Sequence, residues 1–369
     1  MDLAHGTWEG SEQGAAALLS ALVRQRSISG DVAGQVAVID TVLSAVRAIV
    51  PDVRCEAELD APHPWALLTS DALTSDTGGP GGRLLFACHV DTVPVGSSGD
   101  WSVDPFGGEI SDGLVHGRGA SDMKAGVVAS AAALVEACRR GRPAALLLTS
   151  DEEVGCRGAL AARDAVRALA PRAVVIPEAT HNRVHRGHRG ALWLRVVSRG
   201  RAAHGSTPEL GVNAIARLAD LTVRARAELP LTADPYLGPE TVNLGMLSGG
   251  TATNIVPDLA EAHLDHRTVG DGADLLAWWQ RQPETDEVTV TSRLPAVMTD
   301  ADDAWVAQQA PAAEPVRYFT DASVLAPVLP GVPVVIWGPG DPARMHAVDE
   351  NVAVSELEHA IRTFPRLLR

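Results

Sequence analysis

The first 180 residues alternate between segments of helical periodicity and short apolar runs. Apolar residues recur at helical spacing over residues 11–26, 33–49 and 156–169, and a further helix is predicted from Asp122 to residue 140. Short runs typical of buried strands occur at residues 53–59, 65–69, 83–88, 144–149 and 173–176. Strands that alternate with helices predict an α/β fold with a mostly parallel central sheet flanked by helices.

The pattern changes near residue 185. Strands are predicted at residues 191–198, 241–247, 259–265 and 288–292, around one amphipathic helix at residues 213–229. Residues 318–326, a strand at 334–337 and a helix at 354–368 then return to the α/β pattern. We therefore expect one domain formed by residues 1–184 and 296–369, with a smaller α+β domain, residues 185–295, inserted into it. A Gly-rich loop is expected at residues 74–82.

Composition narrows the class of protein. A chain of 369 residues with 46% hydrophobic and 21% charged residues is long enough for two globular domains. Its net charge of −15 disfavours nucleic acid and anionic membranes as partners. We find no membrane span, no signal peptide and no paired spacing of the four cysteines, so we expect a cytoplasmic protein with reduced thiols.

Candidate chemistry begins at the end of the apolar run at residues 84–88. This run is followed by His89 and Asp91, whose side chains point to one side of an extended chain. The pair is either a metal ligand with its orienting carboxylate or a catalytic pair.

Four more segments carry polar residues next to predicted strands or helices. Asp122 follows a Gly-rich turn, where it is either a functional residue or a helix N-cap. Three acids follow the strand at 144–149, Glu178 follows the strand at 173–176, and His346 comes after the strand at 334–337. Ligands bind beyond the carboxyl ends of strands in open α/β sheets. Two imidazoles and several carboxylates suit a hydrolytic centre of two zinc ions about 3.5–4 Å apart that share one carboxylate.

These segments, in order from about residue 15 to 365, resemble the co-catalytic zinc family that includes acetylornithine deacetylase, succinyl-diaminopimelate desuccinylase, aminoacylases and glutamate carboxypeptidases. The resemblance implies that His89 and Glu178 bind one zinc ion and that Glu153 and His346 bind the other. It also implies that Asp122 bridges the two ions, that Asp91 orients His89, and that Glu152 is the general base.

The inserted domain carries further motifs of this family. Residues 200–215 resemble its lid motif, which implies a homodimer in which His204 reaches the partner's site and stabilises an oxyanion. By the same resemblance, Asn254 and Arg267 hold the α-carboxylate of the substrate, and the backbone at Gly340 shapes the pocket.

Some details depart from the family's common pattern. Glu178 lies in the sequence IPEAT, and His346 begins HAVDE rather than the frequent His-Thr-Pro-Asp-Glu. Residues 181–190 contain three further histidines, His181, His185 and His188. This segment is either a further metal site or a polar hinge. It also adds three arginines that could favour an acidic substrate or carrier protein: Arg183, Arg186 and Arg189.

The leading hypothesis is hydrolysis of a linear amide, which removes a small acyl group such as acetyl or succinyl from an N-acyl amino acid. The expected cofactors are two zinc ions, which cobalt or manganese could replace. The alternatives are a dipeptidase or carboxypeptidase of the same family and a non-catalytic metal-binding relative.

Overall fold

The computed structural model describes residues 8–70 and 82–368, so almost all of the Gly-rich loop predicted at residues 74–82 lies outside the described residues. The chain divides into two compact units. The first unit comprises Met1–Gly187, Met298–Val316 and Thr320–Arg369, and the second comprises His188–Val297 and Arg317–Phe319. The short return of Arg317–Phe319 to the second unit differs from the sequence expectation, which placed this segment in the first domain.

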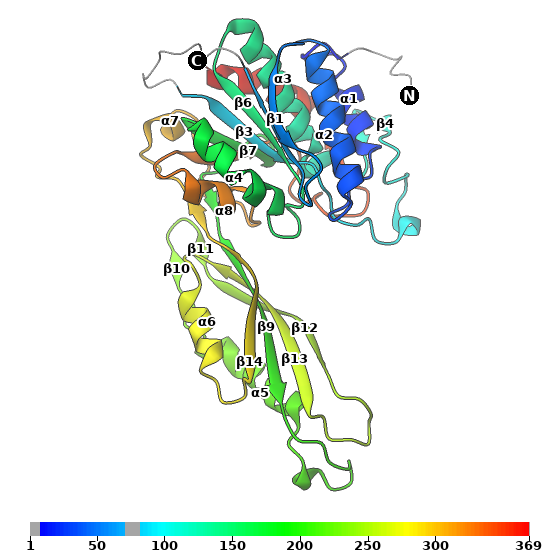
Figure 1. Cartoon of the computed structure of the whole chain (residues 1–369), viewed down its shortest axis with the longest axis vertical. Helices are drawn as coiled ribbons and strands as arrows, with labels where there is room; N and C mark the ends of the chain where they lie inside the picture. The colour runs from blue at the N-terminus through cyan, green and yellow to red at the C-terminus, as the bar shows by residue number, and fades with distance from the viewer. Residues whose placement is uncertain (1–7, 71–81, 369) are drawn as a thin grey trace. The chain divides into compact units, whose positions relative to one another are not determined.

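The first unit is built on a six-stranded sheet in the order β1-β2-β6-β3-β7-β16 (Figure 1). Its strands are β1 (Arg54–Glu58), β2 (Trp65–Thr69), β3 (Leu84–His89), β6 (Ala144–Thr149), β7 (Ala173–Ala179) and β16 (Val334–Gly338). Strands β6, β3, β7 and β16 are parallel, while β2 is antiparallel to β6 and β1 is antiparallel to β2. The mostly parallel sheet is as predicted, and the carboxyl ends of its four parallel strands meet along one edge.

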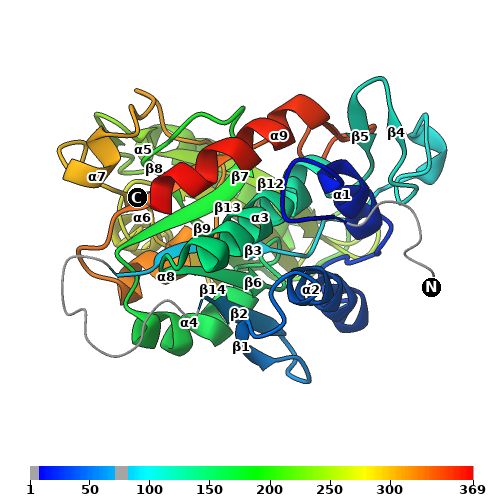
Figure 2. The ribbon, with the colours of Figure 1, turned by 90° about the horizontal axis from the view of Figure 1, so that it is seen from above.

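Helices cover both faces of this sheet (Figure 2). One face is covered by α1 (Ala15–Val23), α2 (Val32–Arg47), α3 (Ala125–Arg140) and α9 (Val354–Thr363). The other face is covered by α4 (Arg157–Leu169) and α8 (Ala322–Leu325). Every residue of β3, β6 and β7 is buried, which explains why these strands are continuous apolar runs rather than alternating patterns.

The turn before α3 departs from the sequence expectation. A helix was predicted to begin at Asp122, but α3 begins at Ala125, and Asp122 and Met123 have non-helical backbone angles. Gly119 precedes this turn with a φ of 84°, a left-handed conformation that suits glycine. A side chain at Gly126 would collide with the carbonyl oxygen of Pro177, so this glycine lets α3 pack directly against β7. Asp122 is thereby held next to the end of β7.

The second unit is a four-stranded antiparallel sheet in the order β12-β13-β9-β14. Its strands are β9 (Gly190–Arg199), β12 (Thr241–Gly249), β13 (Leu259–Thr268) and β14 (Glu287–Leu294). Two helices, α5 (Ala214–Glu228) and α6 (Ala273–Gln280), pack on one face over alternate residues of β9 and β13 such as Leu194 and Ala262. The sequence pattern missed α6 because it has only eight residues, although Trp279 anchors it in the core.

The remaining elements are short. They are β4 (Ile110–Ser111), β5 (Leu114–His116), β8 (Gly187–His188), β10 (Ala233–Asp234), β11 (Gly238–Pro239), β15 (Val297–Met298), α7 (Ala304–Ala307) and β17 (Asn351–Ala353). Strands β17, β5 and β4 form a small sheet. Among the described residues, no helix is both long and apolar enough to cross a membrane.

Candidate metal centre

His89 ends β3 and points its imidazole toward two carboxylates. Its Nε2 lies 3.1 Å from Oδ1 of Asp122 and 3.5 Å from Oε1 of Glu178. All three side chains are buried. Glu178 lies within β7, which extends to Ala179, so the prediction that this acid follows the strand was wrong. The pairing of β16 with β7 shifts register between Ile336 and Gly338, beside this end of β7.

A second group shares Asp122. The Nε2 of His346 lies 3.0 Å from Oδ2 of Asp122 and 3.0 Å from Oε1 of Glu153. Asp122 therefore turns one carboxylate oxygen to His89 and the other to His346. The structure brings together the five residues for which the resemblance implied metal binding, in two groups with one member in common: His89, Asp122 and Glu178; and Asp122, Glu153 and His346.

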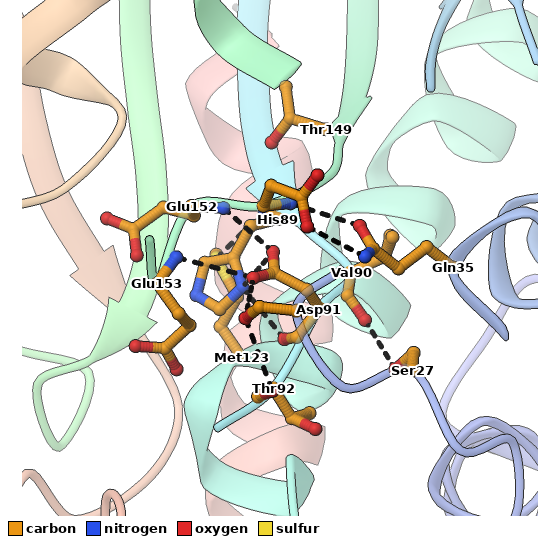
Figure 3. A network of polar contacts seen from close by, with 12 residues as sticks. Ser27, Gln35, His89, Val90, Asp91, Thr92, Met123, Thr149, Glu152 and Glu153 are labelled. Carbon is orange, nitrogen blue, oxygen red and sulfur yellow. Dashed lines mark hydrogen bonds and ion pairs between the residues drawn. The ribbon is translucent and has the colours of Figure 1, made fainter. Parts of the chain in front are cut away.

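Asp91 connects the ends of two neighbouring strands. The Nδ1 of His89 lies 3.1 Å from the backbone oxygen of Asp91 and 3.5 Å from its Oδ1. The Asp91 carboxylate also accepts hydrogen bonds from the backbone N–H groups of Glu152 and Glu153, at 3.0 and 3.3 Å (Figure 3). Ser29 Oγ donates a third hydrogen bond to it at 2.7 Å. Asp91 thus orients His89 and also holds the turn that carries Glu152 and Glu153.

The carboxylates of the site repel one another. Burial raises the pKa of Glu178 to about 8, and the charge of Asp122 acts in the same direction. Burial and the charge of Asp122 likewise raise the pKa of Glu153. Hydrogen bonds with Asp122 and Glu153 raise the pKa of His346 to about 10. So many buried acidic groups at one place favour a bound cation, which removes the cost of keeping them ionised.

Glu152 belongs to neither of these two groups, and its carboxyl group is buried next to Cys156. Burial raises its pKa well above the usual value, and the charges of Glu153 and Asp321 add to this effect while His89 opposes it. The thiol of Cys156 lies 3.7 Å from Oε1 of Glu152, and Asp321 completes a third buried group with these two residues. Asp321 is held by Thr149, whose Oγ1 donates a hydrogen bond to Oδ2 at 2.6 Å.

The donor atoms present fit two divalent ions. Each of the two groups that share Asp122 offers one imidazole nitrogen and two carboxylate oxygens, all within 4.8 Å of one another. The Oε2 atom of Glu178 is buried and has no hydrogen-bond partner among the described residues. Imidazole and carboxylate ligands suit zinc, and no cysteine lies in either group.

Gly340 lies next to the turn that carries Asp122. It has a φ of 113°, and a side chain there would collide with Ser121 Oγ. Its N–H donates a hydrogen bond to Glu356. The predicted pocket residue Gly340 therefore lies against Ser121, the neighbour of Asp122, at a position where only glycine fits.

The three candidate residues of the second unit lie at two different ends of its sheet. His204 pairs with Ile255, and the N–H of Gly205 donates to the backbone oxygen of Asn254 at 2.7 Å, so His204 and Asn254 are neighbours. Asn254 precedes the first residue of β13, Leu259, whereas Arg267 lies near the last. At ~3.3 Å per residue, Leu259 and Arg267 are about 25 Å apart. Because β13 runs between them, Asn254 and Arg267 do not meet within one copy of the chain, and their joint binding of a carboxylate stays a prediction.

The three histidines of residues 181–190 do not gather. His181 pairs with Glu356 and Asp341, while Nδ1 of His185 faces the backbone oxygen of Glu314 and Nδ1 of His188 faces that of Arg189. None of them belongs to a group of potential metal ligands among the described residues. The alternative of a further metal site in this segment is therefore not supported.

The sequence profile of Peptidase family M20/M25/M40 matches residues 85–369, more than half of the chain. The chain belongs to the M20/M25/M40 peptidase family. This match begins at β3 and includes every residue of the two donor groups.

Two similar proteins share one enzyme name. The chain is 32% identical over 317 residues to a succinyl-diaminopimelate desuccinylase of Rhodospirillum centenum, covering 78% of this chain and 81% of the relative. It is 29% identical over 386 residues to an enzyme of the same name from Parvibaculum lavamentivorans, covering 94% and 93%.

Solved structures of other proteins show the same fold. A metallo-carboxypeptidase from Sulfolobus solfataricus has a TM-score of 0.76 at 17% identity and covers 96% of this chain and 98% of its own. Aminopeptidase PepT from Bacillus cereus has a TM-score of 0.74 at 20% identity, covering 97% and 98%. A Bacillus subtilis protein described as a dinuclear metal-binding peptidase has a TM-score of 0.63 at 14% identity, covering 96% and 98%.

Two residues that the sequence patterns did not single out hold the turn that carries Asp122. Oε1 of Glu350 accepts hydrogen bonds from the backbone N–H groups of Ser121 and Asp122, both at 3.0 Å. Its Oε2 accepts a hydrogen bond from the buried Arg118 at 2.6 Å. Glu350 therefore fixes the backbone of Asp122, the residue that the two groups share. The sequence feature that could have identified Glu350 is its position at the end of the HAVDE motif, which begins at His346.

Proposed function

We propose that this chain is a metal-dependent amidohydrolase that removes a small acyl group, acetyl or succinyl, from an N-acyl amino acid. The observation that carries the proposal is the position of Asp122, whose two carboxylate oxygens face different imidazoles at 3.1 and 3.0 Å. Such a shared carboxylate is the arrangement expected of a two-ion hydrolytic site. The names of the desuccinylase relatives support an N-acyl amino acid as the substrate.

The residues that would hold the ions are those of the two groups. His89 and Glu178 would hold one ion, Glu153 and His346 the other, and Asp122 both. When bound, two divalent ions lower the pKa of a water molecule and polarise the carbonyl of the amide. We expect zinc, with cobalt or manganese as replacements.

Glu152 is the proposed general base. Burial gives its carboxyl group a high affinity for a proton, and its backbone is held by Asp91 at 3.0 Å. Glu152 takes a proton from the attacking water and delivers it to the amine nitrogen as the carbon–nitrogen bond breaks. The products are the free carboxylate of the acyl group and the amino acid.

The second unit supplies substrate contacts in this proposal. Strand β12 is an edge of its sheet and exposes three apolar side chains: Leu244 (38%), Met246 (62%) and Leu247 (42%). Such an edge suits pairing with a second copy of the chain. In the resulting homodimer, His204 would reach the site of the partner, and Asn254 and Arg267 would hold the α-carboxylate of the substrate.

The test is a substrate screen with added zinc. N-acetyl and N-succinyl derivatives of ornithine, lysine, diaminopimelate and neutral amino acids are compared with a panel of dipeptides, and released amine is measured. The proposal predicts release from at least one N-acyl amino acid. Turnover of dipeptides with no release from any N-acyl amino acid would assign the chain as a dipeptidase instead.

A further inference from the structure

One end of the sheet in the second unit carries a group of charged and aromatic residues on the face opposite its helices. Leu192 and Leu194 of β9 point into the core beneath α5 and α6. Residues alternate between the faces of a strand, so Trp193 lies on the other face, directly opposite Asp265 of β13. Arg267 is two residues further along on the same face, and Arg189 immediately precedes β9.

The segment Arg317–Phe319 adds a third arginine to this group. The ring of Phe319 lies 6.0 Å from the ring of Trp193 in an edge contact, and the guanidinium carbon of Arg267 lies 5.5 Å from the centre of the Phe319 ring. Arg317, two residues earlier in the same short segment, is exposed. The return of Arg317–Phe319 to the second unit therefore places Arg317 near Arg189 and Arg267.

The positive charge of this group is only partly neutralised. Asp265 pairs with Arg267 at 3.0 Å, but no carboxylate of the described residues forms an ion pair with Arg189 or Arg317. Arg189 donates instead to the backbone oxygen of Pro239 at 2.6 Å. Burial lowers the pKa of Arg189, and the charges of Arg267 and Arg317 act in the same direction. Three guanidinium groups and one carboxylate leave two positive charges.

Hydrogen-bond donors in the group are also unused. The Nε1 of Trp193 and the Nη1 of Arg267 are buried and have no hydrogen-bond partner among the described residues, and the same holds for one acceptor of the group, Oδ1 of Asp265. Elsewhere on the same face, Arg195 is paired with Glu261 at 2.5 Å and Glu287 at 3.4 Å. Unpaired buried donors cost stability unless a ligand accepts from them. The contrast with Arg195 indicates that this end of the sheet is arranged for an external anion.

We propose that Arg189, Arg267 and Arg317, with the indole N–H of Trp193, form a binding site for a dicarboxylate. The assignment of this ligand to the substrate rests on the proposed function, in which Arg267 holds the α-carboxylate. Arg189 and Arg317 then bind a second carboxylate, carried by the acyl group or by the amino-acid side chain. Arg317 is the residue that distinguishes such a substrate from an N-acyl amino acid with one carboxylate.

Equilibrium binding to the zinc-loaded full chain tests the site without turnover. The probes are succinate, butyrate, which has the same chain length but one carboxylate, and inorganic phosphate. A charge-assisted hydrogen bond lost to a missing carboxylate weakens binding about 10-fold or more, so we expect succinate to bind at least that much tighter than butyrate. Equal affinity for succinate and butyrate, or tighter binding of phosphate than of succinate, would overturn the proposal.

Matched variants locate the site. Arg317→Gln and Arg189→Gln should each reduce the preference for succinate by about 10-fold, and Arg317→Lys should restore part of it. Arg226→Gln is the control, because Arg226 is exposed on α5 and forms no ion pair among the described residues. Thermal melting confirms that the variants are folded. A succinate preference that survives in Arg317→Gln, or is lost equally in Arg226→Gln, contradicts the assignment.

Measurements of binding and of activity distinguish failure of the dicarboxylate site from failure of the proposed function. A chain that prefers succinate through Arg317 but releases amine from no N-acyl amino acid keeps the dicarboxylate site and loses the deacylase proposal. A chain that deacylates N-acyl amino acids with no preference for a second carboxylate keeps the proposed function and loses the site.

Discussion

Asp91 Oδ1 accepts a hydrogen bond from the backbone N–H of Glu152 at 3.0 Å, across the ends of β3 and β6. One buried carboxylate thereby orients a proposed metal ligand, His89, and the turn that carries the proposed base. Their relative placement depends on a residue that need not touch metal or substrate.

This relationship predicts the effect of Asp91→Asn. The variant loses the charge beside His89, and its amide can accept with only one atom where the carboxylate accepts from Glu152, Glu153 and Ser29. We expect zinc affinity to fall ~10- to 100-fold, as for other residues that orient ligands. Competition with a chromogenic chelator measures this affinity, and Asp100→Asn, at an exposed position, is the control. Unchanged affinity in Asp91→Asn would refute the orienting role.

Glu152 and Glu153 are neighbours with different predicted roles. Glu152→Gln removes the proposed base, so kcat should fall ~100- to 10,000-fold while both metal ions stay bound. Glu153→Gln removes a carboxylate that faces His346 at 3.0 Å, so it should lose bound metal as well as activity. Metal content by mass spectrometry, measured beside kcat, separates the two. Full activity in Glu152→Gln would exclude the proposed mechanism.

Metal removal should destabilise the first unit. Without cations the buried carboxylates are costly to ionise, because burial, and after it the charge of Asp122, raises the pKa of Glu178 to about 8. A chelator should therefore lower the melting temperature and abolish activity, and added zinc should restore both. His346→Ala should reduce the zinc-dependent gain in melting temperature, whereas His181→Ala, outside both groups, should not. A melting temperature insensitive to zinc would argue against the metal centre.

The homodimer proposal predicts complementation. Separate His204→Ala and Glu152→Gln preparations should both be inactive. If His204 acts on the partner's site, a mixed dimer has one complete site, so randomly exchanged mixtures should regain about a quarter of the wild-type activity. No recovery after verified subunit exchange would place His204 in the site of its own copy. Met246→Asp on the exposed edge of β12 should yield monomers in sedimentation.

His188 predicts a pH dependence of stability in the second unit. Burial lowers its pKa to about 4, with the charge of Arg267 acting in the same direction, whereas an unfolded imidazole has a pKa of about 6.5. The unfolded chain therefore binds more protons between these values, and stability should fall as pH drops from about 6.5 to 4, by on the order of 3 kcal/mol. Denaturant unfolding of His188→Gln should show a shallower loss, and an identical pH profile would contradict this assignment.

The sequence by itself determined the elements and the chemical types at their ends. Hydrophobic periodicity is local, so the buried runs of β3, β6 and β7 and the polar residues beside them could be predicted from their own neighbours. The resemblance added the grouping of His89, Asp122, Glu153, Glu178 and His346. It could do so because these residues occur in separate motifs in a fixed order.

The tertiary structure decided what depends on distant segments. The strand order β6-β3-β7-β16 sets which strand ends meet, and Gly126 packs closely on Pro177, so α3 lies directly against β7. The helix α3 begins at Ala125, beyond Asp122. The length of β13 separates Asn254 from Arg267 within one copy of the chain. Because Arg317–Phe319 belongs to the second unit, Arg317 joins Arg189 and Arg267 there. These relationships join residues far apart in the chain, so no local pattern could predict them.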